Sequence, residues 1–543
     1  DDGEVGYELA YDALILAPGS QAADLPVPGL DNPDIYRLRT VDDAIALRSA
    51  ALGEARADGD DHSIAGKAVV IGAGFIGLEV AEALNHQGWS VCLLEAANQV
   101  LPPLEQELAS LLTDELTRLG VARLTSASVT GVTDRWALAD QTGAEAPAQR
   151  WALDLTTASG GSGGGAVGST TGAASANSAK SVKPATPDSL RLETDLLVLA
   201  VGNRPATDIF VAAGGQTERG YITVDDYGRT SLTDVYAAGD ACLSRDAVTG
   251  VARPVPLAGP ANRAGRLVAD SVIADQLGGR LAGANDSSVA TVALAASRPP
   301  VHRRLPTLLG TAIVRVGRLT VAMTGANRAA LRAAGLDFIT IHLHPNQHAG
   351  YFPGATPIHL LVHLDPESGL ILGAQAVGGD GVDKRIDLLS MAIRSSIPGA
   401  ELVDLDLAYA PPYGSAKDPI TMVGLMIDNL QTGQLRLWSP EQLDWARSDA
   451  VLLLDVRSPA EFASGHLPEA VNIAHTELRS RLGEVERLAA GRPIAVLCQS
   501  GVRSYIAHRI LASAGFDSSS LSGGMSTLKA WLGSTADIVM VTS

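Results

Sequence analysis

The chain has 543 residues, of which 46% are hydrophobic and 19% charged, so it can bury several cores and a wholly disordered protein is excluded. It carries 60 acidic and 41 basic residues, and the formal net charge of −19 argues against nucleic-acid binding through a broad basic surface. No apolar run reaches the ~20 residues of a membrane helix and the start does not resemble a signal peptide, so no membrane partner is expected.

The N-terminal region, residues 1–63, opens with a short apolar strand predicted over 14–17. The first residue is Asp1 rather than methionine. We therefore expect the sequence to be an N-terminally truncated fragment.

Residues 64–200 begin with a strand predicted over 68–71, which leads into a glycine-rich turn. A helix from 76 to about 87 and a strand over 91–94 follow. Strand, turn, helix and strand in this order indicate the start of a βαβ unit.

A Gly-, Ser-, Ala- and Thr-rich stretch interrupts this second region at residues 157–189. Such a composition cannot bury enough apolar surface to order itself, so the stretch is predicted to be a flexible surface insertion. The strand pattern resumes over 196–201.

Three further regions complete the chain. Residues 201–298 contain short strands and an Ala-rich helix predicted over 261–276. Residues 301–432 alternate apolar and polar side chains, as half-buried strands do. Residues 440–543 restart with a strand predicted over 451–455.

The glycine turn predicts a dinucleotide site. Gly72 permits the tight turn, Gly74 lets the backbone approach a pyrophosphate, and Gly77 lets helix and strand pack closely. Glu95 ends the next strand, about twenty residues on, where a carboxylate accepts hydrogen bonds from ribose hydroxyls and repels a 2′-phosphate. NADH is therefore favoured over NADPH. The alternative is a glycine-rich turn that binds nothing.

A second candidate is the pair Gly239-Asp240 at the end of another strand. An acid at such a place can hold a sugar or ribityl hydroxyl. Taken in isolation, a turn-forming Gly-Asp pair is the simpler interpretation.

The three cysteines are too few for a disulfide framework and fit a reducing, cytoplasmic compartment. Cys498 stands between an apolar strand and a helix in C-Q-S-G-V-R-S, where backbone N–H groups and the helix dipole stabilise a persulfide anion. Arg503 adds positive charge and can brace the loop. A phosphatase-like loop competes, but four residues between Cys and Arg suit sulfur better than phosphate. An inert cysteine is the remaining alternative.

Cys92, inside a strand, is interpreted as a core thiol, and Cys242 as loop packing. Four histidines, at 342, 344, 359 and 363, alternate on two predicted strands, which makes a two-histidine metal pair conceivable. No carboxylate or cysteine is spaced to complete the shell, so no metal site is predicted.

In combination, A-P-G-S, V-I-G-A-G-F-I-G-L-E, A-V-G-N-R-P and Y-A-A-G-D resemble the pyridine nucleotide-disulfide oxidoreductase flavoproteins. P-L-A-G-P-A-N-R, H-A-G-Y-F-P-G and Y-A-P-P-Y-G-S-A-K-D-P resemble the coenzyme A (CoA)-disulfide reductase and persulfide reductase branch, which includes members with a C-terminal rhodanese domain. The segment around Cys498 resembles rhodanese, as do Asp455-Val456-Arg457 and Glu461-Phe462, where Asp455, Arg457 and Glu461 are interpreted as scaffold.

The resemblance implies an α/β fold with two Rossmann-like lobes, the first incomplete, then an α+β dimerisation domain and a rhodanese α/β domain. The FAD-binding domain would comprise 1–63 and 201–298, and the NAD(P)-binding domain 64–200. The dimerisation domain would be 301–432 and the rhodanese domain 440–543.

The resemblance also implies FAD and NADH as cofactors, with NADPH as the alternative, and a homodimer. Besides the dinucleotide residues, those implied to bind a cofactor are Gly202, Gly239, Asp240, His348 and Tyr409, the last two reaching toward flavin across the dimer. Asn262, Tyr351 and Lys417 would contact substrate, and Cys498 would accept a sulfane sulfur.

The sequence departs from the family pattern in three ways. The family's first strand–turn–helix for FAD and the cysteine that follows it are not in this sequence, Phe352 replaces a tyrosine, and Pro18 replaces a threonine. Either the sequence is a fragment or flavin chemistry is lost. Cys242, two residues after Asp240, could lie near flavin, although loop packing is the simpler interpretation.

The function implied is an NAD(P)H-dependent reductase of CoA disulfide, CoA persulfide or polysulfide, with a rhodanese domain that handles sulfane sulfur. One alternative is a rhodanese sulfurtransferase with the reductase part as a scaffold. A second is a non-catalytic NADH-binding or redox-sensing protein.

Overall fold

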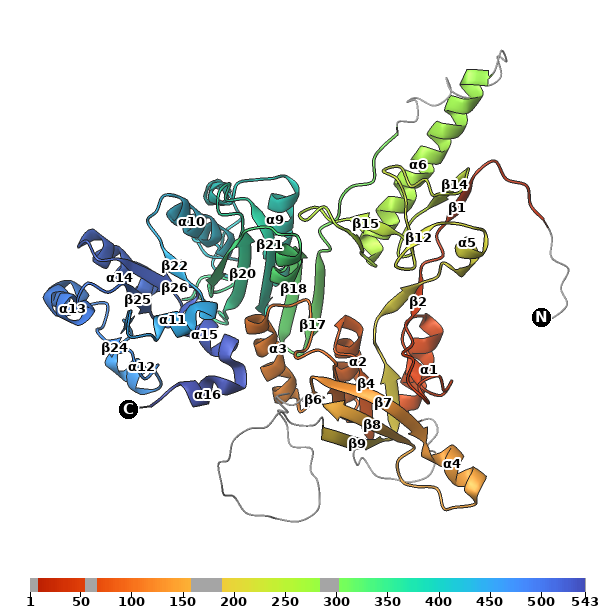
Figure 1. Ribbon diagram of the computed structural model, residues 1–543, viewed down its shortest axis with the longest axis horizontal. Helices are drawn as coiled ribbons and strands as arrows, with labels where there is room; N and C mark the ends of the chain where they lie inside the picture. Colours follow the sequence, from red (N-terminus) through yellow and green to blue (C-terminus); the bar gives the residue numbers. More distant parts are fainter. Residues whose placement is uncertain (1–7, 54–65, 158–187, 284–301, 543) are drawn as a thin grey trace. The chain divides into compact units, whose positions relative to one another are not determined.

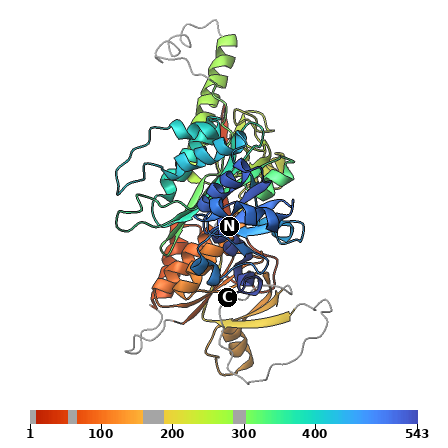
Figure 2. The same ribbon diagram turned by 90° about the vertical axis from the view of Figure 1, so that its left-hand side faces the viewer.

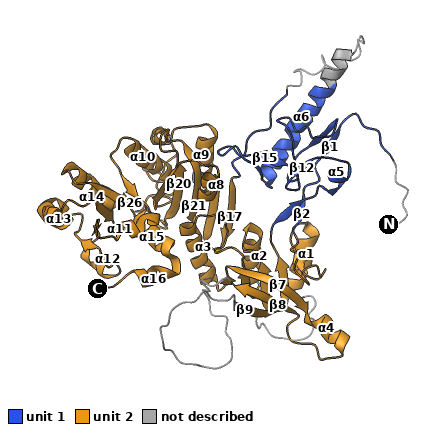
Figure 3. Ribbon diagram, viewed as in Figure 1, with its two compact units in different colours: residues 1–23, 202–310 blue, residues 24–201, 311–543 orange. Residues whose placement is uncertain are grey.

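The computed structural model describes residues 8–53, 66–157, 188–283 and 302–542. The chain forms two compact units, coloured separately in Figure 3. The smaller comprises Asp1–Ala23 and Gly202–Gly310, and the larger Asp24–Val201 and Thr311–Ser543. The predicted insertion at 157–189 lies outside the described residues except at its two ends.

The smaller unit is built around β1 (Leu14–Leu16), which pairs in parallel with β14 (Val235–Ala237). Helix α6 (Ala258–Gly283) is longer than predicted at both ends; at its start, Pro260 lies in the first turn, where a missing N–H costs nothing. The remaining elements are β2 (Ser20–Ala22), β11 (Asn203–Pro205), α5 (Asp208–Ala212), β12 (Thr217–Glu218), β13 (Tyr221–Ile222), β15 (Leu243–Arg245) and β16 (Ala252–Pro254).

The larger unit has three modules. The first, the nucleotide module (Asp24–Val201), has a parallel sheet in the order β3-β10-β4-β5-β6. Its strands are β3 (Tyr36–Arg37), β4 (Lys67–Ile71), β5 (Ser90–Leu94), β6 (Ala122–Leu124) and β10 (Leu196–Leu199), and its helices α1 (Val41–Leu52), α2 (Phe75–His86) and α3 (Gln106–Leu119). Because β3 joins this sheet, the structure groups residues 24–53 with the nucleotide module, whereas the sequence placed 1–63 in the first domain.

A second sheet of the nucleotide module consists of β7 (Ala127–Asp134), β8 (Trp151–Thr157) and β9 (Asp188–Thr194), all antiparallel. Helix α4 (Arg135–Thr142) connects β7 to β8. The ends of the predicted insertion are paired strand residues, since Thr157 is opposite Asp188.

The second, antiparallel module follows Thr311. Its sheet has the order β17-β18-β21-β20-β19, from β17 (Ala312–Val316), β18 (Leu319–Gly325), β19 (Ile339–Leu343), β20 (Ile358–Leu364) and β21 (Ile371–Gly378). One face packs on α9 (Val382–Arg394) and α10 (Pro419–Gln431), the other on α2 and α3 of the nucleotide module (Figures 1 and 2). Residues of α8 (Arg328–Ala333) follow β18. The alternating pattern predicted β19 and β20 as strands correctly, but β20 is buried along almost its whole length and not half-buried, because both faces of the sheet are covered.

The C-terminal module has a parallel sheet in the order β22-β26-β25-β23-β24. Its strands are β22 (Leu437–Trp438), β23 (Leu452–Asp455), β24 (Val471–Asn472), β25 (Ile494–Leu497) and β26 (Ser518–Leu521). Its helices are α11 (Leu443–Ala446), α12 (Pro459–Ala463), α13 (Leu482–Ala489), α14 (Val502–Ser513), α15 (Gly524–Leu532) and α16 (Ala536–Val539). Helix α15 lies against α3, and the Gln106 side chain donates to the Trp531 carbonyl at 2.8 Å.

The predicted α/β fold class is confirmed. The predicted strands and helix around the glycine turn are observed as β4, α2 and β5, each within one residue of its predicted bounds. Among the described residues, no helix combines the length and apolar character needed to cross a membrane.

Candidate functional site

The glycine turn after β4 has the shape that a dinucleotide site requires. Gly72 has φ = 102°, and a Cβ there would lie 2.3 Å from the Ala200 carbonyl oxygen. A Cβ on Gly77 would lie 1.9 Å from the Gly72 carbonyl oxygen, so only glycine lets α2 approach the turn this closely. A Cβ on Gly74, the N-cap of α2, would meet no heavy atom within 4 Å. The space beside Gly74 at the N-terminus of α2 is therefore open, as the predicted approach of a pyrophosphate requires.

Glu95 lies directly beside this turn. Its Oε2 accepts a hydrogen bond from the Ala73 N–H at 2.9 Å, and its Oε1 accepts one from the Ala97 N–H at 2.8 Å. Each oxygen has a second lone pair for a ribose hydroxyl. The structure brings Glu95 and the three glycines together at the carboxyl edge of a parallel sheet; their roles toward NADH stay a prediction.

In the smaller unit, Gly239 and Asp240 follow β14. Gly239 has φ = 86°, and Asp240 accepts a hydrogen bond from the Ser20 hydroxyl at 3.4 Å. Gly202 has φ = 101° with open space around its Cα, and Asn262 is exposed on α6. A carboxylate at a strand end suits the hydroxyls of a flavin cofactor, and these assignments stay predictions.

Two loops of the antiparallel module, 348–354 and 409–414, carry exposed aromatic side chains. The hydroxyls of Tyr351 and Tyr409 lie 3.3 Å apart, and the residues are 78% and 50% exposed. Their hydrogen bond raises the pKa of Tyr409. His348 is buried and makes an edge-to-face contact with Phe352, and Lys417 is exposed. These predicted residues share one loop cluster.

A buried ion pair that the sequence analysis missed holds these loops. The Arg385 guanidinium on α9 donates to Asp418 at 2.6 Å and to the Gln347 carbonyl at 2.9 Å. Asp418 also caps α10 by accepting from the Ile420 N–H. A charged residue on the apolar face of a helix is the signal that could have revealed it.

Cys498 lies at the end of β25 and is fully buried. Its Sγ accepts a hydrogen bond from the Gly501 N–H at 3.3 Å, and its thiol donates to the Ser504 hydroxyl oxygen at 3.3 Å. The Ser520 hydroxyl in turn donates to Ser504 at 2.8 Å. Gly501 is the N-cap of α14, so the sulfur lies at a helix N-terminus, where negative charge is stabilised. The serines had not been singled out.

The Arg503 guanidinium is paired with a carboxylate. It forms two hydrogen bonds to the Glu461 carboxylate, at 2.7 and 2.8 Å, which lower the pKa of Glu461 to about 2. Glu461 also completes a capping box with Ser458 on α12. This fits a bracing role for Arg503. The predicted scaffold pair Asp455 and Arg457 is confirmed as a buried ion pair of 2.6 Å.

The other two cysteines lack such a setting. Burial raises the pKa of Cys92 to about 11 and that of Cys242 to about 12. Cys242 belongs to the apolar core around β14, as the packing interpretation predicted.

Comparison with known proteins agrees with these features. The chain matches the family model of pyridine nucleotide-disulphide oxidoreductases over 1–153 and 166–263, that of their dimerisation domain over 311–418, and that of rhodanese-like domains over 439–530. Reduced CoADR-RHD of Bacillus anthracis is 31% identical with a TM-score of 0.78, over 98% of this chain and 81% of that chain. The chain belongs to the pyridine nucleotide-disulphide oxidoreductase family.

Two further relatives lie in the same family. A NAD-dependent persulfide reductase from A. fulgidus is 29% identical with a TM-score of 0.72, over 96% of this chain and 80% of that chain. The coenzyme A disulfide reductase of Staphylococcus haemolyticus (strain JCSC1435) is 29% identical over 77% of this chain and 76% of its own length. In this family member, the antiparallel module therefore corresponds to the dimerisation domain and the C-terminal module to the rhodanese domain.

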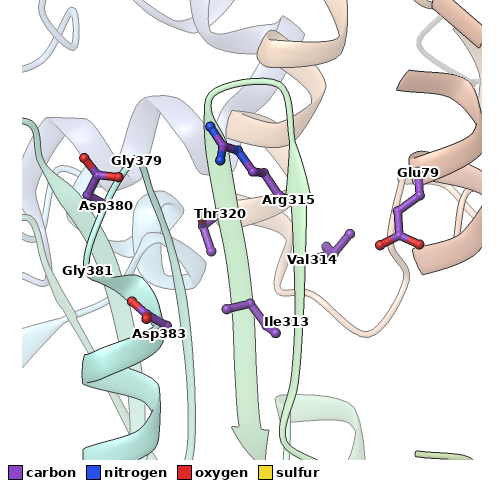
Figure 4. A pocket seen from close by; sticks show the side chains of 9 residues that line it. All are labelled: Glu79, Ile313, Val314, Arg315, Thr320, Gly379, Asp380, Gly381 and Asp383. Atoms are coloured by element: carbon purple, nitrogen blue, oxygen red, sulfur yellow. The ribbon is translucent and has the colours of Figure 1, made fainter. Parts of the chain in front are cut away.

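A cleft of about 430 Å³ lies between α2 and the antiparallel module (Figure 4). The carboxylates of Glu79, Asp380 and Asp383 line it together with Arg315. Glu79 stands on α2 just beyond the glycine turn. Three acids around one guanidinium disfavour a phosphate here.

Two of the four histidines contact carboxylates. His342 Nε2 lies 2.7 Å from Glu107, and His363 Nε2 lies 3.3 Å from Glu105. The acids belong to the nucleotide module, so spacing along the two strands could not show them. Within the described ranges, no group of three or more His, Cys, Asp or Glu is arranged to hold a metal ion.

Proposed function

We propose that the protein is an NAD(P)H-dependent flavoprotein that reduces CoA disulfide, CoA persulfide or polysulfide, and that its rhodanese domain accepts and passes on sulfane sulfur. The observation that carries the proposal is the presence, in one chain of this family, of an open dinucleotide turn and a buried sulfur loop around Cys498. Relatives named as CoA disulfide reductase and persulfide reductase support the substrate class.

The nucleotide module would bind NADH through the amides at Gly74 and the carboxylate of Glu95, which disfavours the 2′-phosphate of NADPH. The acidic cleft at Glu79 would receive the nicotinamide end, because it repels phosphates. Gly202 and Gly239-Asp240 would hold part of FAD, which would supply the chemistry that links a two-electron hydride donor to a sulfur acceptor.

The exposed aromatic loops suit a homodimer, to which the match with a dimerisation domain also points. Tyr351, Tyr409 and the partly exposed Phe352 present apolar surface, and contact with a second copy would bury it. In that assembly His348 and Tyr409 would approach the partner's flavin, and Tyr351, Lys417 and Asn262 would contact the substrate.

Sulfur transfer at Cys498 would take two steps. The Cys498 thiolate attacks the sulfane sulfur of a donor, releases the donor's other fragment as the leaving group and becomes Cys–S–S⁻. An acceptor thiolate then attacks the outer sulfur, which regenerates the Cys498 thiolate. With CoA as acceptor, the reductase would convert CoA–S–SH, NADH and H⁺ into CoA–SH, H₂S and NAD⁺. We infer a cytoplasmic location, which the three free cysteines support.

The test is to mix purified protein with NADH and follow the visible flavin absorbance, then to add CoA persulfide or CoA disulfide. We expect flavin bleaching by NADH and one H₂S released per NADH oxidised with the persulfide. The ratio of kcat/KM values for the two substrates identifies the preferred one. Sulfur transfer by Cys498 with no NADH oxidation on either substrate would overturn the reductase proposal.

A further inference from the structure

The three modules of the larger unit meet at a buried polar cluster that the proposed function does not use. It contains Glu105 and Glu107 of the nucleotide module, Arg328, His342 and His363 of the antiparallel module, and Ser522 of the C-terminal module. Among the described residues, no fully buried side-chain nitrogen or oxygen lacks a hydrogen-bond partner. A fully satisfied polar cluster in a core fixes one arrangement of the parts that share it.

The acids anchor the cluster to the nucleotide module. Arg328 donates to Glu105 at 3.0 Å and to Glu107 at 2.5 Å. Burial opposes ionisation of Glu107, but hydrogen bonds from His342 and Arg328 outweigh it and hold the pKa of Glu107 far below its usual range. Removal of one partner would leave a buried charge uncompensated, so the arrangement resists separation.

His342 connects this anchor to the C-terminal module. Its backbone N–H donates to the Ser522 hydroxyl oxygen at 3.0 Å, and its Nδ1 lies 2.8 Å from the same oxygen. Its Nε2 lies 2.7 Å from Glu107. All three contacts are satisfied by one assignment: Ser522 donates to Nδ1, and Nε2–H donates to the Glu107 carboxylate.

Ser522 leads directly to the sulfur loop. The next two residues are Gly523 and Gly524, and a Cβ on Gly523 would lie 2.7 Å from the His342 Cβ. A Cβ on Gly524 would lie 2.5 Å from the carbonyl oxygen of Cys498. Gly523 and Gly524 are thus packed between His342 and Cys498 so closely that neither has room for a Cβ.

Hydrogen bonds fix the same contact. The Met525 N–H donates to the Cys498 carbonyl at 2.8 Å, and the Ser526 N–H donates to the Gln499 carbonyl at 2.9 Å. The glycine pair and the sulfur loop therefore move together.

We propose that His342 is a positioning residue for Cys498: through Ser522 and the glycine pair, it holds the sulfur loop in a fixed place relative to the antiparallel module. The assignment rests on the proposed sulfur transfer for its catalytic meaning, but not for its geometry. The C-terminal module is then a fixed part of the larger unit, and donors and acceptors must diffuse to Cys498.

Two substitutions separate the bonds of His342. In His342→Asn the amide takes the place of Nδ1 and keeps the contact with Ser522. In His342→Gln it takes the place of Nε2 and keeps the contact with Glu107. We expect His342→Gln to raise the iodoacetamide alkylation rate of Cys498 and to lower the kcat of thiosulfate-to-CoA sulfur transfer, each about tenfold, as for one lost buried hydrogen bond. His342→Asn stays within about threefold of the original protein in both.

Mass spectrometry of each alkylated cysteine supplies the internal control, since Cys92 and Cys242 stay unreactive if the fold is intact. Arg332→Ala is the matched variant, because it breaks an exposed ion pair of 2.9 Å to Glu441 between the same two modules and should change neither readout. If His342→Gln does not fold, Ser522→Ala removes the same bond and should give the same two changes.

The proposal is overturned if the alkylation rate of Cys498 is unchanged in both His342→Gln and Ser522→Ala. It is also overturned if His342→Asn and His342→Gln raise that rate equally. Absence of sulfur transfer in the unsubstituted protein would instead overturn the proposed function. The alkylation ratio still decides the positioning role in that case.

Discussion

The junctions after β4 and β25 have the same local structure but differ in what lies at the helix N-terminus. In each, a buried parallel strand ends in a loop, and a helix begins at a glycine, Gly74 in α2 and Gly501 in α14. The helix N-terminus at Gly74 faces open space, whereas the Gly501 N–H points at the Sγ of Cys498. The first therefore suits an anion that arrives from solution, and the second a sulfur anion that belongs to the chain.

The two junctions also depend on different parts of the chain. The open turn owes its shape to backbone contacts that exclude any side chain at Gly72 and Gly77. The closed loop depends on side-chain hydroxyls, since Ser520 donates to Ser504 beside the buried sulfur. Substitutions at one junction should therefore leave the other intact.

The largest expected effect comes from Cys498→Ser. A hydroxyl in place of the thiol is a far poorer nucleophile for sulfur, so thiosulfate-to-thiol transfer should fall at least about 1,000-fold. NADH affinity, measured by fluorescence titration, should stay within about twofold, because the dinucleotide turn lies in another module. A variant that retained sulfur transfer would show that Cys498 is not the carrier.

At the open turn, Glu95→Gln should weaken NADH binding by about tenfold, since it removes charge-assisted hydrogen bonds to the turn and to the ribose. NADPH binding should change less, because the carboxylate that repels a 2′-phosphate is also removed. Titration of both nucleotides measures the two Kd values. An unchanged Kd for NADH would remove Glu95 from the site, and sulfur transfer by the same sample controls for folding.

Inside the sulfur loop, Ser504→Ala should lower sulfur transfer about fivefold and slow Cys498 alkylation at fixed pH, because the Ser504 hydroxyl can turn from the Gly501 carbonyl and donate to Sγ once Cys498 ionises. Ser520→Ala is the matched control. It reaches the sulfur only through Ser504 and should have a smaller effect in the same assay. A larger effect at Ser520 would contradict this order.

The two junctions also show which features could be predicted from the sequence and which could not. The glycine turn, Glu95 and Cys498 were found because each function lies in a short stretch whose spacing fixes its geometry. The family resemblance supplied the module order in the same way. Helix and strand bounds near these motifs were within one residue, since apolar runs and glycines end the elements there.

Contacts between distant segments could not be found in this way. Glu107 and His342 meet because α3 packs on the antiparallel module, and no spacing along either segment indicates it. The same holds for Arg385 with Asp418, and for Ser520 with Ser504. The grouping of residues 24–53 with the nucleotide module likewise depends on the pairing of β3 with β10, which could not be predicted from a strand of two residues.

The smallest expected effect tests whether Arg503 braces the sulfur loop or serves the sulfur. Its carboxylate partner has a pKa of about 2, below the ordinary 4.5, chiefly because Arg503 hydrogen-bonds to it. A depressed pKa means that the pair stabilises the fold above about pH 4.5 and loses that contribution as the pH falls toward 2.

Glu461→Gln should therefore lower Tm by about 2 °C at neutral pH, a small amount because the pair is partly exposed to solvent. The difference in Tm from the unsubstituted protein should shrink between about pH 4.5 and 2, as thermal unfolding at several pH values can measure. Sulfur transfer should fall about twofold if Arg503 only braces the loop. A rise in sulfur transfer would mean that Arg503, once released from Glu461, reaches the sulfur of Cys498. The closed loop would then resemble the open turn, since each would direct positive charge at an anion.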